Sequence, residues 1–184
     1  MRIKTCKIPG CFELLPDVHC DHRGVFVKTF HEEIFSNYGL ITSFAEEYYS
    51  GSHKKVLRGL HFQAPPMDHI KMVYCVQGSV LDVVVDLRVG SPTYGQFEAF
   101  QLSADLHNMI YIPRGLAHGF YVQSEYAIML YKVTTVYSPE HDCGISWSSI
   151  GYSWPDSTPI ISARDSDFID LKDFKSPFRY EGSA

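Results

Sequence analysis

The 184-residue sequence lacks the features that mark several common classes of protein. No apolar run approaches the roughly 20 residues needed for a membrane span, so no membrane association is expected. The five cysteines are odd in number and form no Cys-x-x-Cys pair, and the first ten residues contain no apolar stretch typical of a secretion signal. These absences predict a reduced, cytoplasmic protein rather than a disulfide-stapled secreted one.

Blocks of like charge are also missing, and the formal net charge is −5. This pattern argues against a nucleic-acid partner or a polybasic membrane patch. An anionic ligand would have to be met by individual arginines and lysines against a weakly unfavourable overall field. Because the sequence shows no repeat, low-complexity tract or linker, we expect one domain over residues 1–184.

Aromatic residues are abundant, with twelve Tyr and twelve Phe, and they favour strands around a ligand-holding interior. The segments 24–30 and 56–62 are apolar and β-branched. The segment 71–103 contains three further runs, separated by Gln77-Gly78 and by the Gly-Ser-Pro stretch at 90–92. Short strands with close turn signals are typical of an all-β jelly-roll barrel whose edges are closed.

Helical signals are few. The segment 31–39 predicts one short helix that ends at Gly39. From residue 148 onward the prolines and aspartates show no clean period. We therefore expect a jelly-roll barrel with short peripheral helices and an irregular C-terminal tail, which packs over the barrel.

Four polar residues stand inside strand-like apolar runs, where a solvated charge is normally excluded. They are Arg58, His61, Lys71 and Asp82. Buried charges are costly unless they are paired or used in function. The alternation of a strand puts Asp82 on an inward face, and pairing of neighbouring strands would bring Lys71 near it. The alternative is a set of salt bridges at the rim of a sheet.

A metal site is not expected, although His118 lies in a Pro-x-Gly-x-x-His turn that resembles the second cupin motif. The first cupin motif needs two histidines spaced His-x-His and a carboxylate shortly after, because divalent metals favour imidazole and carboxylate ligands. Here the corresponding stretch is His61-Phe62-Gln63, with no carboxylate directly after it. At most His61, His118 and His69 remain as ligands.

The same residues suit proton transfer at a carbon beside a ketone. An imidazole such as that of His61 can act as the base near neutral pH, and the phenol of Tyr131 can act as an acid opposite it. Lys71 would supply a cation for the developing enolate oxygen. Asp165, in the "SARD" stretch of the tail, offers a carboxylate to orient the histidine. The alternative for Tyr131 is a place in the apolar core.

Six stretches then occur in an order that resembles one family. They are "DHRGVF", "VLRGLHFQ", "DLRVGSPTYGQF", "YIPRGLAHGF", "LYKVTTVYSP" and "SWPDSTPIISARD". The sequence resembles the dTDP-4-dehydrorhamnose 3,5-epimerases over nearly its whole length. The resemblance implies an enzyme with a cupin-type jelly-roll barrel that needs no metal or other cofactor. It also implies a homodimer with exchanged N-terminal strands and a nucleoside-diphosphate 4-keto-6-deoxyhexose as substrate.

The resemblance also implies roles for individual residues. His61 takes the position of the base and Asp165 that of its carboxylate partner. Tyr131 is the acid on the opposite face, and Lys71 lies near the ketone oxygen. The residues that match the remaining pocket positions are Arg23 and Arg58 at the diphosphate, Tyr137 as an aromatic packed against the base, and Asp82, His118 and Gln63 elsewhere in the pocket.

Two positions depart from the family pattern at the nucleotide end of the pocket. Glu46 stands where the family has Gln, and Tyr48 where it has Asn. A Gln both donates and accepts hydrogen bonds, whereas an ionised Glu only accepts. The change would weaken a contact to thymine and favour cytosine or guanine. The alternative is neutral drift at the rim.

The sequence therefore predicts an epimerase acting at C3, C5 or both. The nucleotide, and whether the sugar is already deoxygenated at C3, stay open. An epimerase that inverts a single carbon of a CDP- or GDP-linked sugar, a 3,4-ketoisomerase and a non-catalytic sugar-binding cupin are the alternatives.

Overall fold

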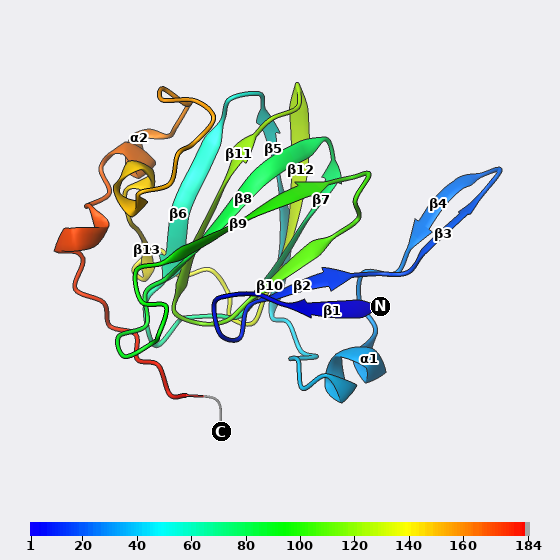
Figure 1. Cartoon of the computed structure of the whole chain (residues 1–184), viewed down its shortest axis with the longest axis horizontal. Helices are drawn as coiled ribbons and strands as arrows, with labels where there is room; N and C mark the ends of the chain where they lie inside the picture. The colour runs from blue at the N-terminus through cyan, green and yellow to red at the C-terminus, as the bar shows by residue number, and fades with distance from the viewer. Residues whose placement is uncertain (183–184) are drawn as a thin grey trace.

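The computed structural model describes residues 1–182 and consists mainly of β-strands (Figure 1). The strands are β1 (Arg2–Thr5), β2 (Phe12–Leu15), β3 (Val18–Asp21), β4 (Gly24–Val27), β5 (Glu46–His53), β6 (Leu57–Gln63), β7 (Lys71–Gln77), β8 (Ser79–Asp86), β9 (Phe97–Ser103), β10 (Met109–Ile112), β11 (Leu116–Val122), β12 (Tyr126–Val133) and β13 (Asp142–Gly144). The helices are α1 (Glu32–Asn37) and α2 (Ala163–Ser166), and the 3₁₀ turns are η1 (Trp147–Ile150) and η2 (Leu171–Asp173).

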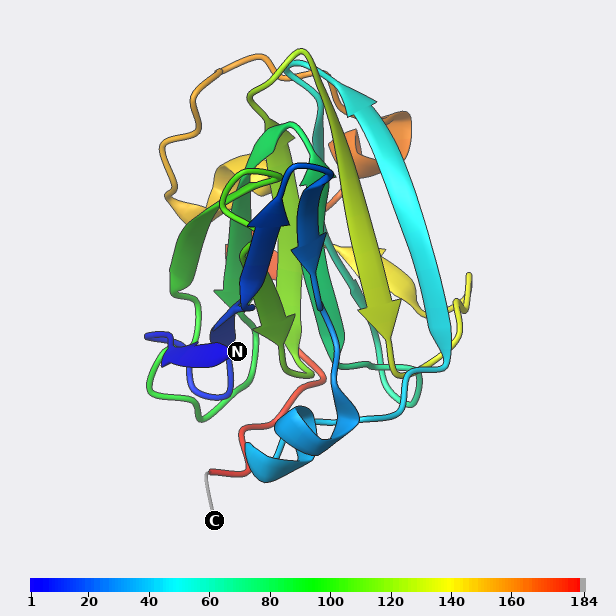
Figure 2. The same ribbon diagram turned by 90° about the vertical axis from the view of Figure 1, so that its right-hand side faces the viewer.

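Two antiparallel sheets face each other (Figure 2). One has the strand order β1-β2-β10-β7-β12-β5 and the other the order β13-β6-β11-β8-β9. The jelly-roll expectation is confirmed, but the expectation of closed edges is wrong. The consecutive strands β5 and β6 enter different sheets, and side chains from both strands line a cavity. The fold is therefore a two-sheet sandwich that opens between these strands.

The turn between β7 and β8 carries the chain from one sheet to the other. The predicted break at Gln77-Gly78 is confirmed. Gly78 has φ +76°, and a Cβ there would lie 2.1 Å from the carbonyl oxygen of Tyr126, so only glycine fits. The two strands do not pair with each other, so strand pairing is not what brings Lys71 near Asp82. Lys71 and Asp82 therefore influence each other across the sandwich rather than along one sheet.

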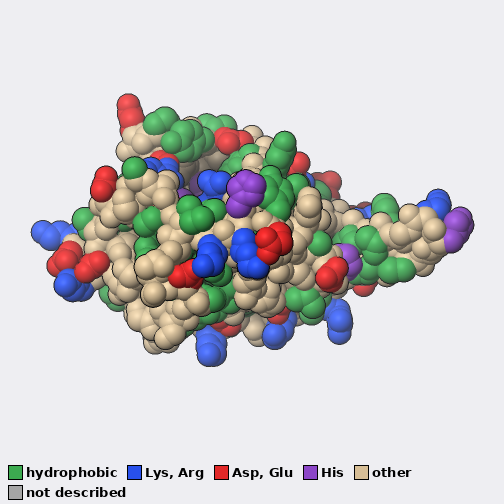
Figure 3. Space-filling view, turned by 90° about the horizontal axis from the view of Figure 1, so that it is seen from above, with side chains coloured by type: hydrophobic (Ala, Val, Ile, Leu, Met, Phe, Trp, Pro, Cys, Tyr) green, Lys and Arg blue, Asp and Glu red, His purple; other side chains and the backbone are tan. Residues whose placement is uncertain are grey.

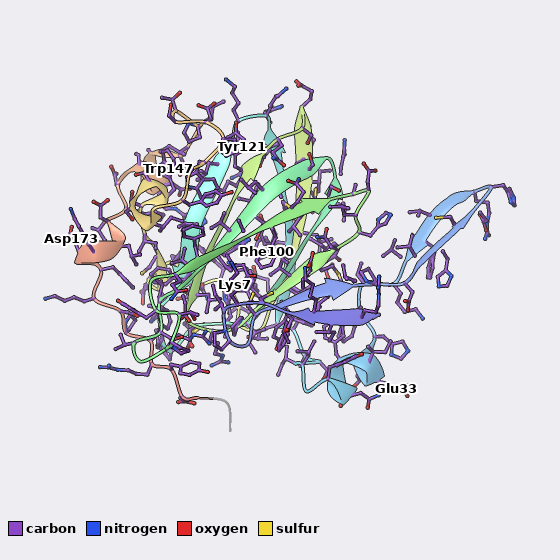
Figure 4. All side chains as sticks on the ribbon, viewed as in Figure 1. Lys7, Glu33, Phe100, Tyr121, Trp147 and Asp173 are labelled. Atoms are coloured by element: carbon purple, nitrogen blue, oxygen red, sulfur yellow. The ribbon has the colours of Figure 1, made fainter. Side chains whose placement is uncertain are left out.

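Apolar side chains fill both faces of β8. Val84 packs between the sheets with Val73, Phe120 and Met129. Val83 and Val85 face outward into a second cluster, which the C-terminal tail covers with Ile145, Ile150 and Phe178 among others. Burying each such side chain stabilises the fold by about 1.5–3 kcal/mol. The predicted covering of the sheet by the tail is confirmed, and Trp147 marks this segment in Figure 4.

The predicted short helix is confirmed as α1, and Gly39 follows it with φ +70°. The strand predicted over 24–30 ends at Val27 instead. Phe30 leaves the strand because its ring packs against Phe35 and Phe44 beside α1. No helix within residues 1–182 is long and apolar enough to cross a membrane.

Candidate active site

A cavity of about 370 Å³ lies between the sheets. It collects side chains from β5, β6, β7, β11 and β12 and from the segments that follow β12. Most of the residues singled out in the sequence contribute to its wall, namely Glu46, Tyr48, Arg58, His61, Gln63, Lys71, His118, Tyr131 and Tyr137.

The His61 side of the cavity combines an imidazole with a buried carboxylate. His61 Nε2 lies 2.9 Å from Asp165 Oδ1, and the other carboxylate oxygen accepts a hydrogen bond of 2.9 Å from the Gly59 amide. Burial alone would raise the pKa of Asp165, but the hydrogen bonds from His61, Gly59 and Ser162 lower it well below its ordinary value. An ionised carboxylate therefore stands behind the imidazole.

Backbone contact between β6 and β11 places that amide. Gly59 has φ +122°, and a Cβ there would lie 2.7 Å from Gly119 Cα. The register of the two strands shifts between His118 and Phe120, next to this contact. Glycine at both positions lets the strands approach closely, so Gly59 can donate to the carboxylate that enters from α2.

Arg164 joins this group, although the sequence analysis did not single it out. Its Nη2 lies 2.8 Å from His61 Nε2, and its Nη1 donates to Asp142. One ring nitrogen cannot donate to Asp165 and accept from Arg164 at the same time, so the proton position on the ring selects the partner. The position of Arg164 directly before Asp165 in the "SARD" stretch was the signal that could have indicated its place in the site.

Tyr131 lies on β12, in the sheet opposite His61. Its hydroxyl is 3.1 Å from Ser50 Oγ, and its ring stacks on Tyr48. Burial raises the pKa of Tyr131 well above its ordinary value, so the phenol keeps its proton. Ser50 was missed in the sequence, where only the alternation along β5 connects it with Tyr48.

Besides Arg164, the cations Lys71 and Arg58 line the cavity. Burial lowers the pKa of Lys71 to about 8, against the opposing effect of the Asp82 and Asp142 charges. Arg58 is more exposed, and its Nε donates to Ser52 Oγ over 2.9 Å. The buried cation suits a charge that develops during reaction, whereas the exposed guanidinium suits a diphosphate.

His118 and Asp82 form a buried pair, with 2.7 Å between Nε2 and Oδ2. Burial lowers the pKa of His118, and the neighbouring Asp82 charge opposes this effect. His118 contacts the cavity, whereas Asp82 lies behind it and is not part of the wall. Asp82 therefore orients the imidazole of His118 rather than meeting a ligand.

Gln63 holds two loops together. Its Nε2 donates to the Met67 carbonyl oxygen over 2.8 Å, and its Oε1 accepts from the Ser138 amide over 2.7 Å. His69 lies beside it, and burial together with the Lys71 charge lowers the pKa of His69 to about 3. Within the part of the chain that the structure describes, no group of three or more His, Cys, Asp or Glu side chains could hold a metal ion.

The nucleotide-end residues have contacts of their own. Glu46 Oε2 accepts a hydrogen bond of 2.7 Å from the Tyr137 amide, so one carboxylate oxygen is bonded to the loop after β12. The aromatic ring that packs edge-on against His61 belongs to Phe168, with 5.7 Å between centroids. Tyr137 instead directs its hydroxyl to Asp142, at 3.3 Å.

Arg23 does not contribute to the cavity of its own chain. It stands at the tip of the hairpin β3–β4, where its Nη2 lies 2.6 Å from Asp21 Oδ2. This hairpin forms a separate two-stranded sheet and projects from the body of the molecule (Figure 1). Any contact between Arg23 and a ligand in such a cavity therefore involves another molecule or a large movement.

A two-sheet jelly roll with a histidine–carboxylate pair on one wall and a buried tyrosine on the other defines a cupin-type acid–base site. Comparison with known proteins narrows this class. The family model for dTDP-4-dehydrorhamnose 3,5-epimerase matches residues 5–173. The chain belongs to this family of isomerases.

Individual relatives agree with this assignment over nearly the whole chain. A dTDP-4-dehydrorhamnose 3,5-epimerase of Salmonella typhimurium is 44% identical, covering 89% of this chain and 91% of the relative. A dTDP-4-dehydrorhamnose 3-epimerase of Streptomyces niveus is 37% identical, covering 92% and 83%. The crystal structure of a Legionella pneumophila dTDP-6-deoxy-D-glucose-3,5-epimerase with dTDP-4-keto-L-rhamnose is similar at a TM-score of 0.93 and 33% identity, covering 98% and 99%.

Proposed function

We propose that this chain inverts C3, C5 or both of a nucleoside-diphosphate 4-keto-6-deoxyhexose, as a step in deoxysugar synthesis. One observation carries the proposal. His61 on β6 and Tyr131 on β12 come from different sheets and line the same cavity, and Asp165 from α2 contacts His61 from behind. Inversion of a carbon requires removal of a proton from one face and its return on the other, so this arrangement matches the chemistry.

The base side works through charge. His61 takes the proton from a carbon beside the C4 ketone, and the electron pair of the broken C–H bond forms the enolate. The ionised Asp165 behind the ring stabilises the imidazolium that results. Lys71 is buried in the same cavity, and its ammonium form stabilises the negative charge on the enolate oxygen.

The acid side completes the inversion. Tyr131 donates its phenolic proton to the carbon on the face opposite His61, and the enolate collapses to the ketone. Because the product has the same atoms as the substrate, His61 must afterwards release one proton and Tyr131 must regain one. Ser50, within hydrogen-bond distance of the phenol, is positioned to pass a proton back to it.

The nucleotide is proposed to be thymidine diphosphate, since the names of the relatives above carry dTDP. Arg58 presents a guanidinium at the cavity, which suits the diphosphate that dTDP-, CDP- and GDP-linked sugars share. Glu46 gives one oxygen to the Tyr137 amide and keeps one to accept from a ligand, so CDP- and GDP-linked sugars remain the alternatives to test.

We also propose that the chain acts as one domain in a homodimer with exchanged N-terminal strands. Val25 and Phe26 on β4 are 53% and 61% exposed, and apolar side chains exposed together on a protruding hairpin suit a contact with another protein surface. The hairpin stands away from the body, with basic and histidine side chains at its tip (Figure 3). The open edge of β5, beside the cavity, offers a strand for the partner's hairpin to pair with.

Deuterium exchange tests the enzyme directly. The protein is incubated in D₂O with the dTDP-, CDP- and GDP-linked 4-keto-6-deoxyglucose, and NMR follows incorporation at C3 and C5. Incorporation with inversion, fastest for dTDP, is the expected result. No incorporation from a folded protein with any of the three would overturn the proposal. A carbonyl moved to C3 in the product would identify a 3,4-ketoisomerase instead.

Mixing two inactive variants tests the exchanged dimer. Arg23→Ala and His61→Ala each damage every cavity of their own homodimer. If the hairpin crosses to the partner, a mixed dimer contains one cavity with both defects and one intact cavity. Activity should then return after mixed refolding. Permanent inactivity of the mixture, with both variants shown to be dimeric, would place Arg23 in its own chain or outside the site.

A further inference from the structure

The acid Tyr131 is held in place by the neighbouring strand. In the β12–β5 pair, Tyr131 is directly opposite Tyr48. Directly opposed residues point to the same face of a sheet, and here the two rings stack with 4.7 Å between centroids and 14° between planes. One face of the catalytic ring is therefore covered by another aromatic side chain.

Two further contacts restrict the movement of the Tyr131 ring. Ser50, two residues along β5 and so on the same face, lies 3.1 Å from the Tyr131 hydroxyl. The ring of His118 meets Tyr131 edge-on, at 6.3 Å between centroids and 72° between planes. Rotation of the Tyr131 side chain to a new position would break the stack with Tyr48 and the contact with Ser50 together.

Family membership leaves the inverted carbon undetermined, because the relatives are named both as a 3,5-epimerase and as a 3-epimerase. C3 and C5 lie on either side of the ketone carbon, and each must receive its proton from the same phenol. A misplacement of about 1 Å at a reacting centre can cost roughly 100-fold in rate. An acid that cannot move therefore serves one of the two carbons better than the other.

We propose that Tyr48 is the positioning residue that restricts Tyr131 to one carbon, so that the enzyme inverts that carbon much faster than the other. This inference rests on the proposed epimerase function. Tyr48 touches the acid through its ring, and its effect on stereochemistry acts through Tyr131. The residue expected from the sequence to contact the nucleotide thus also selects the position of the reaction.

The test measures the ratio of inversion at C3 to inversion at C5, using dTDP-4-keto-6-deoxyglucose in D₂O. Deuterium incorporated without inversion reports removal and return of the proton by His61, so dividing inversion by incorporation isolates the acid. The wild type should favour one carbon by about tenfold or more. Tyr48→Ala should move the ratio toward one, whereas Tyr48→Phe keeps the stacked ring and should restore the wild-type ratio.

Two further variants secure the interpretation. Ser50→Ala removes the second hold on the phenol and should move the ratio in the same direction, which keeps the test valid if Tyr48→Ala fails to fold. Tyr94→Ala changes an exposed tyrosine outside the cavity and should leave activity and ratio unchanged.

Equal inversion of both carbons by the wild type would overturn the positioning role. An unchanged ratio in folded Tyr48→Ala and Ser50→Ala proteins would do the same, and so would a Tyr48→Phe ratio that matches Tyr48→Ala. No incorporation by the wild type would instead overturn the epimerase proposal itself.

Discussion

The two walls of the cavity place their reactive side chains in different electrostatic environments. On the wall formed by β6, His61 is surrounded by charge, with Asp165 and Arg164 within hydrogen-bond distance of one ring nitrogen. On the wall formed by β12, Tyr131 is buried among neutral groups, namely the ring of Tyr48 and the hydroxyl of Ser50.

This difference follows what each half of the reaction needs. A base that becomes a cation is stabilised by an anion behind it, and Asp165 is held ionised for that purpose. An acid should keep its proton until the enolate forms, and burial raises the pKa of Tyr131 against the opposing effects of the Ser50 hydrogen bond and the Arg58 charge. The sandwich can provide both environments because its walls are separate sheets.

Removing the base from the β6 wall should cause the largest loss of activity. His61→Ala leaves the acid wall intact but removes proton abstraction, so deuterium incorporation at both carbons should fall by about 10³-fold or more. NMR of the substrate in D₂O measures it. His107→Ala, in the turn before β10 and outside the cavity, is the control and should exchange normally. Substantial exchange in His61→Ala would place the base elsewhere.

Removing the acid should separate exchange from inversion. Tyr131→Phe keeps the ring between Tyr48 and His118 but has no proton to donate, while His61 still exchanges protons on its own face. Inversion should fall by about 100-fold, with a smaller loss of deuterium incorporation. Parallel loss of both signals would show that Tyr131 does not act as the opposite-face acid.

The decrease of activity at alkaline pH should test the role of the Lys71 cation in the cavity. The pKa of Lys71 is lowered to about 8, so its charge is present below that pH and lost above it. The value of kcat/KM should then fall by about tenfold per pH unit above 8. Lys71→Met should be slow at all pH values and lack this decrease. A profile that stays flat to pH 10 in the wild type would contradict the assignment.

Stability against acid should show the smallest effect. The pKa of Asp165 is lowered in the folded state, so its contribution is complete above the ordinary carboxyl pKa of about 3.9 and is lost as the pH falls toward the folded value. Asp165→Asn should lose on the order of 2 kcal/mol at pH 7, and the gap to wild type should shrink below pH 4. Urea unfolding across pH measures it, with the exposed Asp167→Asn as control. A constant gap between pH 7 and pH 3 would argue against an ionised Asp165.

Local signals in the sequence accounted for most elements of the fold. Gln77-Gly78 ends a strand because only glycine fits that turn, and Gly39 follows the helix for a similar reason. Pairing between strands was harder to predict, since β7 and β8 are adjacent in sequence but lie in different sheets. Turn chemistry is local, whereas the choice of partner strand depends on the packing of the whole sandwich.

The candidate site divides in the same way. The sequence by itself determined which residue types are available for acid–base chemistry, since burying a polar side chain in an apolar strand is costly unless it is paired or used in function. Only the tertiary structure decided that His61 and Tyr131 stand on opposite walls and that Arg23 lies outside the cavity of its own chain. It also decided that Tyr48 stacks on the acid and that Arg164 competes for the base. These contacts join residues up to 103 positions apart, and such neighbours are set by the three-dimensional packing rather than by spacing along the chain.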